Sequence, residues 1–148
     1  MLISASLDTE LSCTALHDVL ADLGRYPEWL EIVRRAEPAD PAEGDVGPAW
    51  FVDLQGQVGP FRRSKRLRMV REVSRRCERV RFDRREVDGA SHSPWTLSVD
   101  LHSARTGATT VAVELYYGGR LWVPVLDRVL RDEIERSKPR LVALAGVS

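Results

Sequence analysis

The chain has 148 residues, 43% of them hydrophobic, which is enough for one compact domain with its own core. Its 22 basic and 22 acidic residues cancel, so the whole molecule exerts no long-range attraction on nucleic acid or on an anionic membrane surface. We therefore expect a single domain over residues 1–148 with no nucleic-acid partner.

The cysteines and the N-terminal stretch predict a cellular location. Cys13 and Cys77 stand far apart and outside any CxxC motif, so two buried or inert thiols are expected rather than a disulfide framework or a thiolate metal site. The stretch MLISASLDTELSC lacks the positive end and apolar run of a secretory signal, and no run approaches the ~20 apolar residues of a membrane span. These features predict a cytoplasmic protein without a membrane span. The excess of arginine over lysine suggests a GC-rich bacterial genome.

The first third of the sequence predicts a strand and two helices. Residues 2–7 alternate apolar and small polar side chains, as a strand does, and residues 8–12 supply side chains that cap a helix. Apolar residues at helical spacing follow, and Gly24 is expected to end that helix. Pro27 and Trp29 suit the beginning of a second short helix.

From about residue 32 to residue 119, apolar residues alternate in short runs separated by Gly, Pro, Asp and Ser, which predicts a meander of antiparallel strands. After residue 119 the apolar residues return to helical spacing, and this predicts a long amphipathic C-terminal helix with a kink at Pro139. A sheet with one apolar face needs a cover, and the long helix is the obvious one. The expected fold class is α+β.

Three segments resemble the SRPBCC or START-like superfamily, in particular its bacterial polyketide cyclase/dehydrase branch. They are residues 19–29 (VLADLGRYPEW), the strand at 95–101, and residues 115–119 (LYYGG) leading into the last helix. The resemblance covers essentially the whole chain. It implies the helix-grip fold, in which a curved antiparallel sheet of about seven strands wraps around a long C-terminal helix, with two short helices after the first strand. It does not specify an activity, because that superfamily is implied to include lipid carriers, hormone receptors and aromatic cyclases.

The cavity between sheet and helix is the candidate site, because pockets for small molecules are mostly apolar. Its lining is expected to come from the apolar faces of the strands and the last helix, although each residue could equally be ordinary core. The expected lining residues are Trp29, Trp50, Val52, Leu54, Met69, Phe82, Trp95, Leu97, Leu115, Tyr117, Leu126, Leu130 and Ile134.

Two polar residues are candidates for contacts with a ligand. Arg84 shares the parity of Phe82, so it points either into the cavity, where it would meet a ligand carboxylate or enolate, or out into solvent at the strand end. Tyr117 could donate to a ligand carbonyl or act as a general acid, although a buried tyrosine bonded to a backbone carbonyl is commoner. The histidines lack metal-site spacing, and hydrolase and phosphate-binding motifs are missing, so no metal, cofactor or recognisable catalytic machinery is expected.

The charges are unevenly distributed along the strands. Residues 61–85 hold twelve Arg or Lys against three acidic residues, a local charge of about +9 on the usual ionised states. Residues 36–57 hold five acidic residues and no basic one, so neighbouring strands are expected to neutralise each other through cross-strand pairs. The alternative is a docking surface for an acidic partner or an anionic lipid headgroup.

Three hypotheses of function remain from the sequence. The first is binding or transport of a hydrophobic small molecule, such as a lipid, an aromatic or a polyketide-like metabolite, with affinity from apolar burial. The second, implied by the resemblance, is a polyketide cyclase or dehydratase acting on an aromatic polyketide precursor. The third is a protein-interaction module that uses the groove and the basic hairpin. A mostly apolar closed cavity would favour the first, and convergence of Arg84 with Tyr117 the second. A homodimer also stays open.

Overall fold

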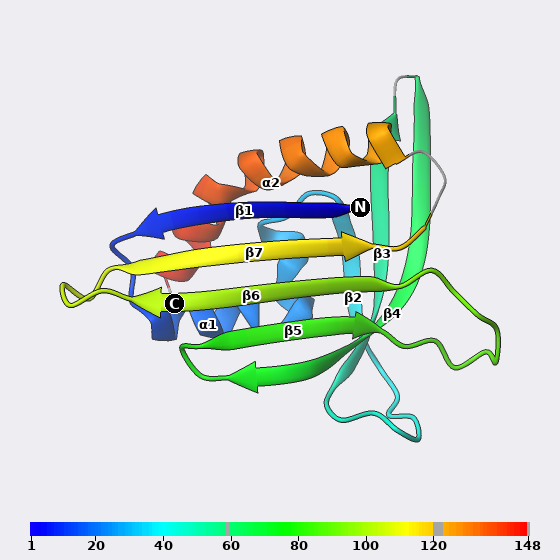
Figure 1. The fold of residues 1–148 in the computed structure, drawn as a ribbon, viewed down its shortest axis with the longest axis horizontal. Helices are drawn as coiled ribbons and strands as arrows, with labels where there is room; N and C mark the ends of the chain where they lie inside the picture. The colour runs from blue at the N-terminus through cyan, green and yellow to red at the C-terminus, as the bar shows by residue number, and fades with distance from the viewer. Residues whose placement is uncertain (59, 120–122, 148) are drawn as a thin grey trace.

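The computed structural model describes residues 1–58, 60–119 and 123–147, with the backbone alone at 58, 61 and 123–126. Over these residues the seven strands form one antiparallel sheet in the order β1-β7-β6-β5-β4-β3-β2 (Figure 1). The prediction of about seven strands, two short helices and a long C-terminal helix is confirmed. The elements are β1 (Leu2–Thr9), α1 (Cys13–Leu20), the 3-10 helix η1 (Leu23–Glu28), β2 (Val33–Ala39), β3 (Ala49–Val58), β4 (Phe61–Arg75), β5 (Arg79–Arg84), β6 (Trp95–Ser103), β7 (Thr109–Tyr117) and α2 (Val123–Gly146).

The sheet is strongly curved, and β4 makes the corner. Residues 61–70 of β4 pair with β3, whereas residues 69–75 pair with β5, and the second register shifts between Arg71 and Val73. Such an irregularity bends a strand and increases its twist. In Figure 1, β3 and the beginning of β4 therefore run steeply across the direction of β5, β6, β7 and β1, and α2 lies along the concave side.

The helices after β1 differ in their boundaries from the prediction. Ser12 caps α1, because its Oγ accepts a hydrogen bond from the Ala15 N–H at 3.3 Å. The helix ends at Leu20, earlier than expected, and Gly24 belongs to η1. Asp22 causes the difference, because its Oδ1 accepts from the Gly24 N–H at 2.9 Å and so begins a new 3-10 helix there.

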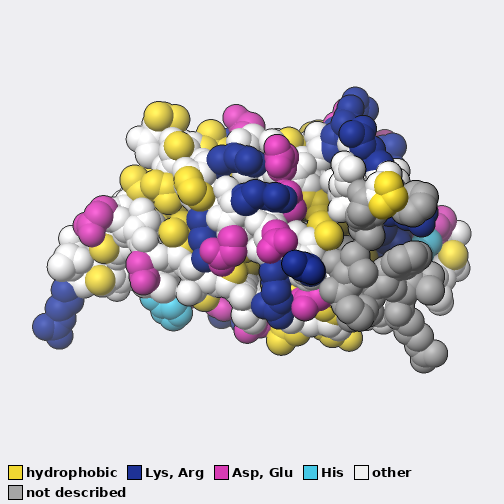
Figure 2. Space-filling view, turned by 90° about the horizontal axis from the view of Figure 1, so that it is seen from above, with side chains coloured by type: hydrophobic (Ala, Val, Ile, Leu, Met, Phe, Trp, Pro, Cys, Tyr) yellow, Lys and Arg dark blue, Asp and Glu magenta, His cyan; other side chains and the backbone are white. Residues whose placement is uncertain are grey.

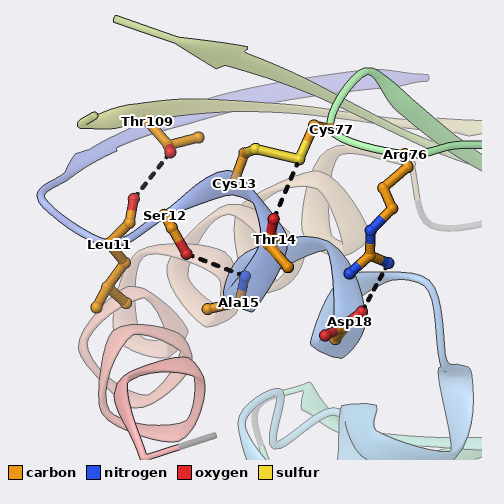
Figure 3. Close-up of a disulfide and its surroundings, with 9 residues drawn as sticks. All are labelled: Leu11, Ser12, Cys13, Thr14, Ala15, Asp18, Arg76, Cys77 and Thr109. Atoms are coloured by element: carbon orange, nitrogen blue, oxygen red, sulfur yellow. Dashed lines mark hydrogen bonds and ion pairs between the residues drawn. A yellow bond between two sulfur atoms is a disulfide. The ribbon is translucent and has the colours of Figure 1, made fainter. Parts of the chain in front are cut away.

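The expectation of two free thiols is wrong, because Cys13 and Cys77 form a disulfide. Cys13 begins α1, and Cys77 lies in the turn between β4 and β5, where it adopts a φ of 60°. Figure 3 shows this turn against the first turn of α1, with Arg76 donating to Asp18 Oδ1 at 3.0 Å beside the disulfide. The bond joins residues 64 positions apart, so it fastens α1 to the sheet.

Part of the basic stretch is neutralised by acidic residues nearby. The expected cross-strand pairing is confirmed at Arg66, whose Nε lies 3.8 Å from Asp53 Oδ1 across β3 and β4. Arg85 donates to Glu72 Oε1 at 2.6 Å. Arg68 differs from the other described basic residues of β4 because it is buried, with 1% of its surface exposed.

The outer face of α2 is polar, as its pattern predicted. Seen from above, acidic and basic side chains intermix over the middle of this face (Figure 2). Arg131 donates to Asp127 there. Pro139 lies inside the helix, which continues on both sides of it, and the kink expected there stays a prediction. Among the described residues, none of the helices has the length and hydropathy needed to span a membrane.

Candidate functional site

A cavity lies between the concave face of the sheet and α2. It offers about 110 Å³ to the centres of water-sized spheres. One water needs roughly 10–15 Å³ in this measure, so the space is on the order of seven to eleven waters. The walls come from β1, β3, β4, β6 and β7, from α2, and from the segment that runs from the end of α1 into β2. This space suits a compact ligand of one or two rings or a short chain.

Eight of the predicted residues line the cavity. Parity identifies them because alternate residues of a strand, and every third or fourth residue of a helix, face the same side. Parity also identifies further lining residues, such as Leu67, Val99 and Val113, which share faces with residues already predicted. That these side chains contact a ligand is a proposal taken up below. The eight are Trp29, Val52, Leu54, Met69, Leu97, Leu115, Leu130 and Ile134.

Trp50 and Phe82 are buried but do not line the cavity. Their ring centroids lie 5.8 Å apart, and Phe82 also meets the ring of Tyr26 edge-on at 6.0 Å. Tyr26 in turn packs on Trp29 at 4.8 Å and donates its hydroxyl to the Leu20 carbonyl at 2.8 Å. Burial raises the pKa of the Tyr26 hydroxyl. These four rings make an aromatic cluster that fills the space beneath η1 and forms one wall of the cavity through Tyr26 and Trp29.

Trp95 and Tyr117 also lie outside the cavity lining. They are directly opposite each other on β6 and β7, and their ring centroids are 4.6 Å apart. Trp95 lies two residues before Leu97 and Tyr117 two residues after Leu115, so each shares the face of that leucine. At this end of the sheet the two rings extend the core beyond the cavity. The remaining predicted residue, Leu126, has a side chain outside the described part of the structure.

Arg84 is neither exposed nor in the cavity. Only 7% of its side chain is accessible, and its Nε donates to Glu86 Oε1 at 3.0 Å. Its Nη1 donates to the Ser93 carbonyl at 3.2 Å, and its Nη2 lies 3.3 Å from His92 Nδ1. The guanidinium therefore organises the connection between β5 and β6. Neither Arg84 nor Tyr117 reaches the cavity wall, so the two do not converge there on a ligand.

The inner face of α2 brings polar side chains to the cavity wall that the apolar pattern did not reveal. Ser137 donates to the Ile134 carbonyl at 2.7 Å, and Lys138 donates to Glu135 Oε1 at 2.7 Å. Glu133 lies three residues after Leu130, so the helical period itself places it on this face. The lining residues expected from the last helix were all apolar and did not include Glu133. No group of three His, Cys, Asp or Glu suited to a metal gathers within the described ranges.

A curved antiparallel sheet closed by a long C-terminal helix, with a cavity between them, defines the helix-grip class of α+β proteins. No model of a known protein family matches the sequence, and no curated protein matches it. Solved structures do match. A START superfamily protein from Mycobacterium smegmatis has a TM-score of 0.73 and 13% identity, over 99% of this chain and 97% of that one.

Two further matches are named as aromatase/cyclases. The Zhui aromatase/cyclase from a Streptomyces species has a TM-score of 0.70 and 12% identity, over 99% of this chain and 93% of that one. The di-domain ARO/CYC StfQ from the steffimycin biosynthetic pathway has a TM-score of 0.68 and 14% identity, over 98% of this chain and 45% of that one. The chain therefore has the START-like helix-grip fold that its sequence resemblance implied. At these identities the likeness shows the fold, and the function has to be argued from the cavity.

Proposed function

We propose that the protein binds or carries a hydrophobic small molecule in the cavity between the sheet and α2. The observation that carries this proposal is the cavity itself, whose walls are almost entirely apolar. Burying apolar ligand surface there is favourable by about 25 cal/mol per Å². The eight predicted residues that line the cavity would supply much of that contact. The fold supports the proposal, because one structural match is titled a START superfamily protein.

Catalysis as a polyketide cyclase or dehydratase is less well supported. It draws on two structural matches that are named as aromatase/cyclases. The two residues that the sequence offered for stabilising an enolate, Arg84 and Tyr117, do not line the cavity. An interaction module would instead use basic residues that stay exposed near the β3–β4 tip, such as Arg62 and Lys65. Binding of a hydrophobic molecule needs neither a catalytic pair in the cavity nor an exposed basic surface, so we favour it.

The disulfide bears on the proposed location. A cytoplasmic protein would hold Cys13 and Cys77 as thiols, since cytosolic reductants keep most disulfides open, whereas the oxidised pair of this structure suits an oxidising compartment. Alkylation of the protein in its host cells, before and after reduction, measures which form exists. Cysteines that are alkylated before reduction support the cytoplasmic location, and cysteines that are alkylated only after reduction overturn it.

Native mass spectrometry of freshly purified protein, followed by denaturing extraction, tests the proposed binding. A discrete small-molecule adduct is expected. Ala5→Phe would fill the cavity from β1, while Ala112→Phe places the same side chain on β7 outside the cavity lining and serves as the control. We expect the adduct to be lost from the first variant and kept by the second. No adduct, together with no thermal shift against lipids or aromatic compounds, would overturn the proposal in favour of an interaction module.

A further inference from the structure

Glu133 is the unusual group in the cavity wall. It lies on the inner face of α2, with 8% of its surface exposed. Its Oε1 accepts a hydrogen bond from Arg136, which lies one turn further along the helix. Its Oε2 is buried and has no hydrogen-bond partner within the described part of the chain. Buried carboxylate oxygens are normally bonded, so this atom has an unused capacity to accept a hydrogen bond.

The other polar groups around the cavity are mostly satisfied within the protein. The hydroxyls of Tyr26 and Ser137 donate to backbone carbonyls, and the Lys138 ammonium donates to Glu135. Trp29 is the exception, since its Nε1–H is buried without a partner in the described residues. Among the buried side-chain atoms around the cavity, the described residues thus hold an unused acceptor, Glu133 Oε2, and an unused donor, Trp29 Nε1–H.

Water is a poor partner for the Glu133 carboxylate at this position. A buried water is held by two to four polar partners, whereas most of the wall here is apolar and the hydroxyls of Tyr26 and Ser137 already donate to backbone carbonyls. A donor that is carried on an apolar body avoids this difficulty. Its N–H or O–H satisfies the carboxylate oxygen, while its hydrocarbon part packs against leucine and valine side chains.

We propose that Glu133 selects the ligand, by accepting a hydrogen bond from a hydroxyl or amino group on an otherwise apolar molecule. This inference rests on the proposed binding function and specifies the chemistry of the ligand. A carboxylate bonded to Arg136 offers acceptors, so a ligand with a carboxylate of its own would bring a like charge and no donor. The site should therefore favour apolar alcohols, phenols or amines over fatty or aromatic acids.

The test uses four probes with the same ring system and different functional groups: 2-naphthol, 2-naphthylmethylamine, naphthalene and 2-naphthoate. Calorimetric titration of the full chain measures the Kd of each. We expect the naphthol, the amine or both to bind at least tenfold more tightly than naphthalene and 2-naphthoate. The comparison of the first two shows whether a neutral hydroxyl or a cationic amine is the preferred donor.

Glu133→Leu removes the acceptor and keeps an apolar side chain of similar size. It leaves Arg136 in solvent, since 60% of that side chain is exposed, so the fold is expected to persist. In this variant the preference for the donor-bearing probes should disappear, while naphthalene binding stays within about threefold of its original strength. Asp132→Leu removes an exposed carboxylate of α2 that does not line the cavity, and its preferences should match those of the original protein.

The outcomes separate this inference from the binding function. If naphthalene binds but Glu133→Leu leaves the ranking of the four probes unchanged, the role of Glu133 is overturned and the binding function stands. If 2-naphthoate binds as tightly as 2-naphthol, the selection for donors is likewise wrong. If none of the four probes binds, the role of Glu133 falls together with binding of compact aromatic ligands.

Discussion

Arg68 and Asp45 form a two-point ion pair inside the protein. Arg68 Nη1 donates to Asp45 Oδ1 at 3.1 Å, and Nη2 donates to Oδ2 at 2.6 Å, with 1% and 8% of the two side chains exposed. The same guanidinium donates to the backbone carbonyls of Asp40 and Arg85. It therefore ties the long connection between β2 and β3 to the bend of the sheet, and its hydrogen bonds lower the pKa of Asp45.

Breaking this pair should be costly. Asp45→Asn leaves the Arg68 charge buried without its counter-charge, so we expect the free energy of unfolding to fall by about 3–5 kcal/mol. Arg66 lies two residues before Arg68 on β4, and its side chain is 60% exposed. Arg66→Met should therefore cost less than about 1 kcal/mol. Urea denaturation of both variants measures the difference. Equal losses in the two variants would show that the buried ion pair contributes no more to stability than the exposed arginine does.

His17 should make stability depend on pH. It is 4% exposed, and its Nδ1 has no partner among the residues described. Burial, followed by the positive charge of Arg76, lowers its pKa below the ordinary 6.5, and Asp18 opposes this only in part. Below about pH 6.5 the unfolded chain therefore takes up a proton that the folded chain resists, so the free energy of unfolding falls as the pH decreases.

The measurement compares urea midpoints at pH 7.5 and pH 5.5 for the protein and two variants. His17→Gln should lose less stability on acidification than the unsubstituted chain. His102→Gln changes an exposed histidine of β6 and should keep the original dependence. An unchanged pH dependence in the His17 variant would assign the effect to other groups.

Reduction of the disulfide should destabilise the fold without changing its topology. Cys13 and Cys77 close a loop of 64 residues, for which chain entropy predicts a stabilisation of about 4 kcal/mol. The melting temperature should therefore fall on addition of a phosphine reductant. The double variant Cys13→Ser, Cys77→Ser should melt at the lower temperature with or without the reductant. If reduction does not change the melting temperature of the original protein, the disulfide adds nothing to its stability.

Arg84 should matter for stability and not for ligand binding. Arg84→Met removes its hydrogen bonds to Glu86 and to the Ser93 carbonyl, which we expect to cost about 1–3 kcal/mol. Since Arg84 does not line the cavity, the Kd of a cavity ligand should stay within about twofold. Thermal unfolding and titration of the same preparation measure both. A large loss of affinity with an unchanged melting temperature would restore the sequence-based role for Arg84 in contacting the ligand.

The periodicity of the sequence determined the order and type of the elements, and with the resemblance it predicted the helix-grip fold. Parity placed Val52, Leu97 and Leu115 on the cavity side, because the direction of a side chain from a regular strand is a local property. Parity could not separate cavity from filled core. Trp50 and Phe82 share the apolar face, yet their rings pack together beneath η1.

Only the tertiary structure decided the contacts between distant residues. Arg68 meets Asp45 from 23 positions away, and Cys13 meets Cys77 from 64, and neither pairing leaves a periodic trace in the sequence. The same holds for Glu133, whose helical position predicts its direction but whose missing partner depends on which side chains surround it. Hydrophobic patterning is read from neighbours along the chain, whereas disulfides, buried ion pairs and unsatisfied polar atoms depend on how the folded chain brings distant residues together.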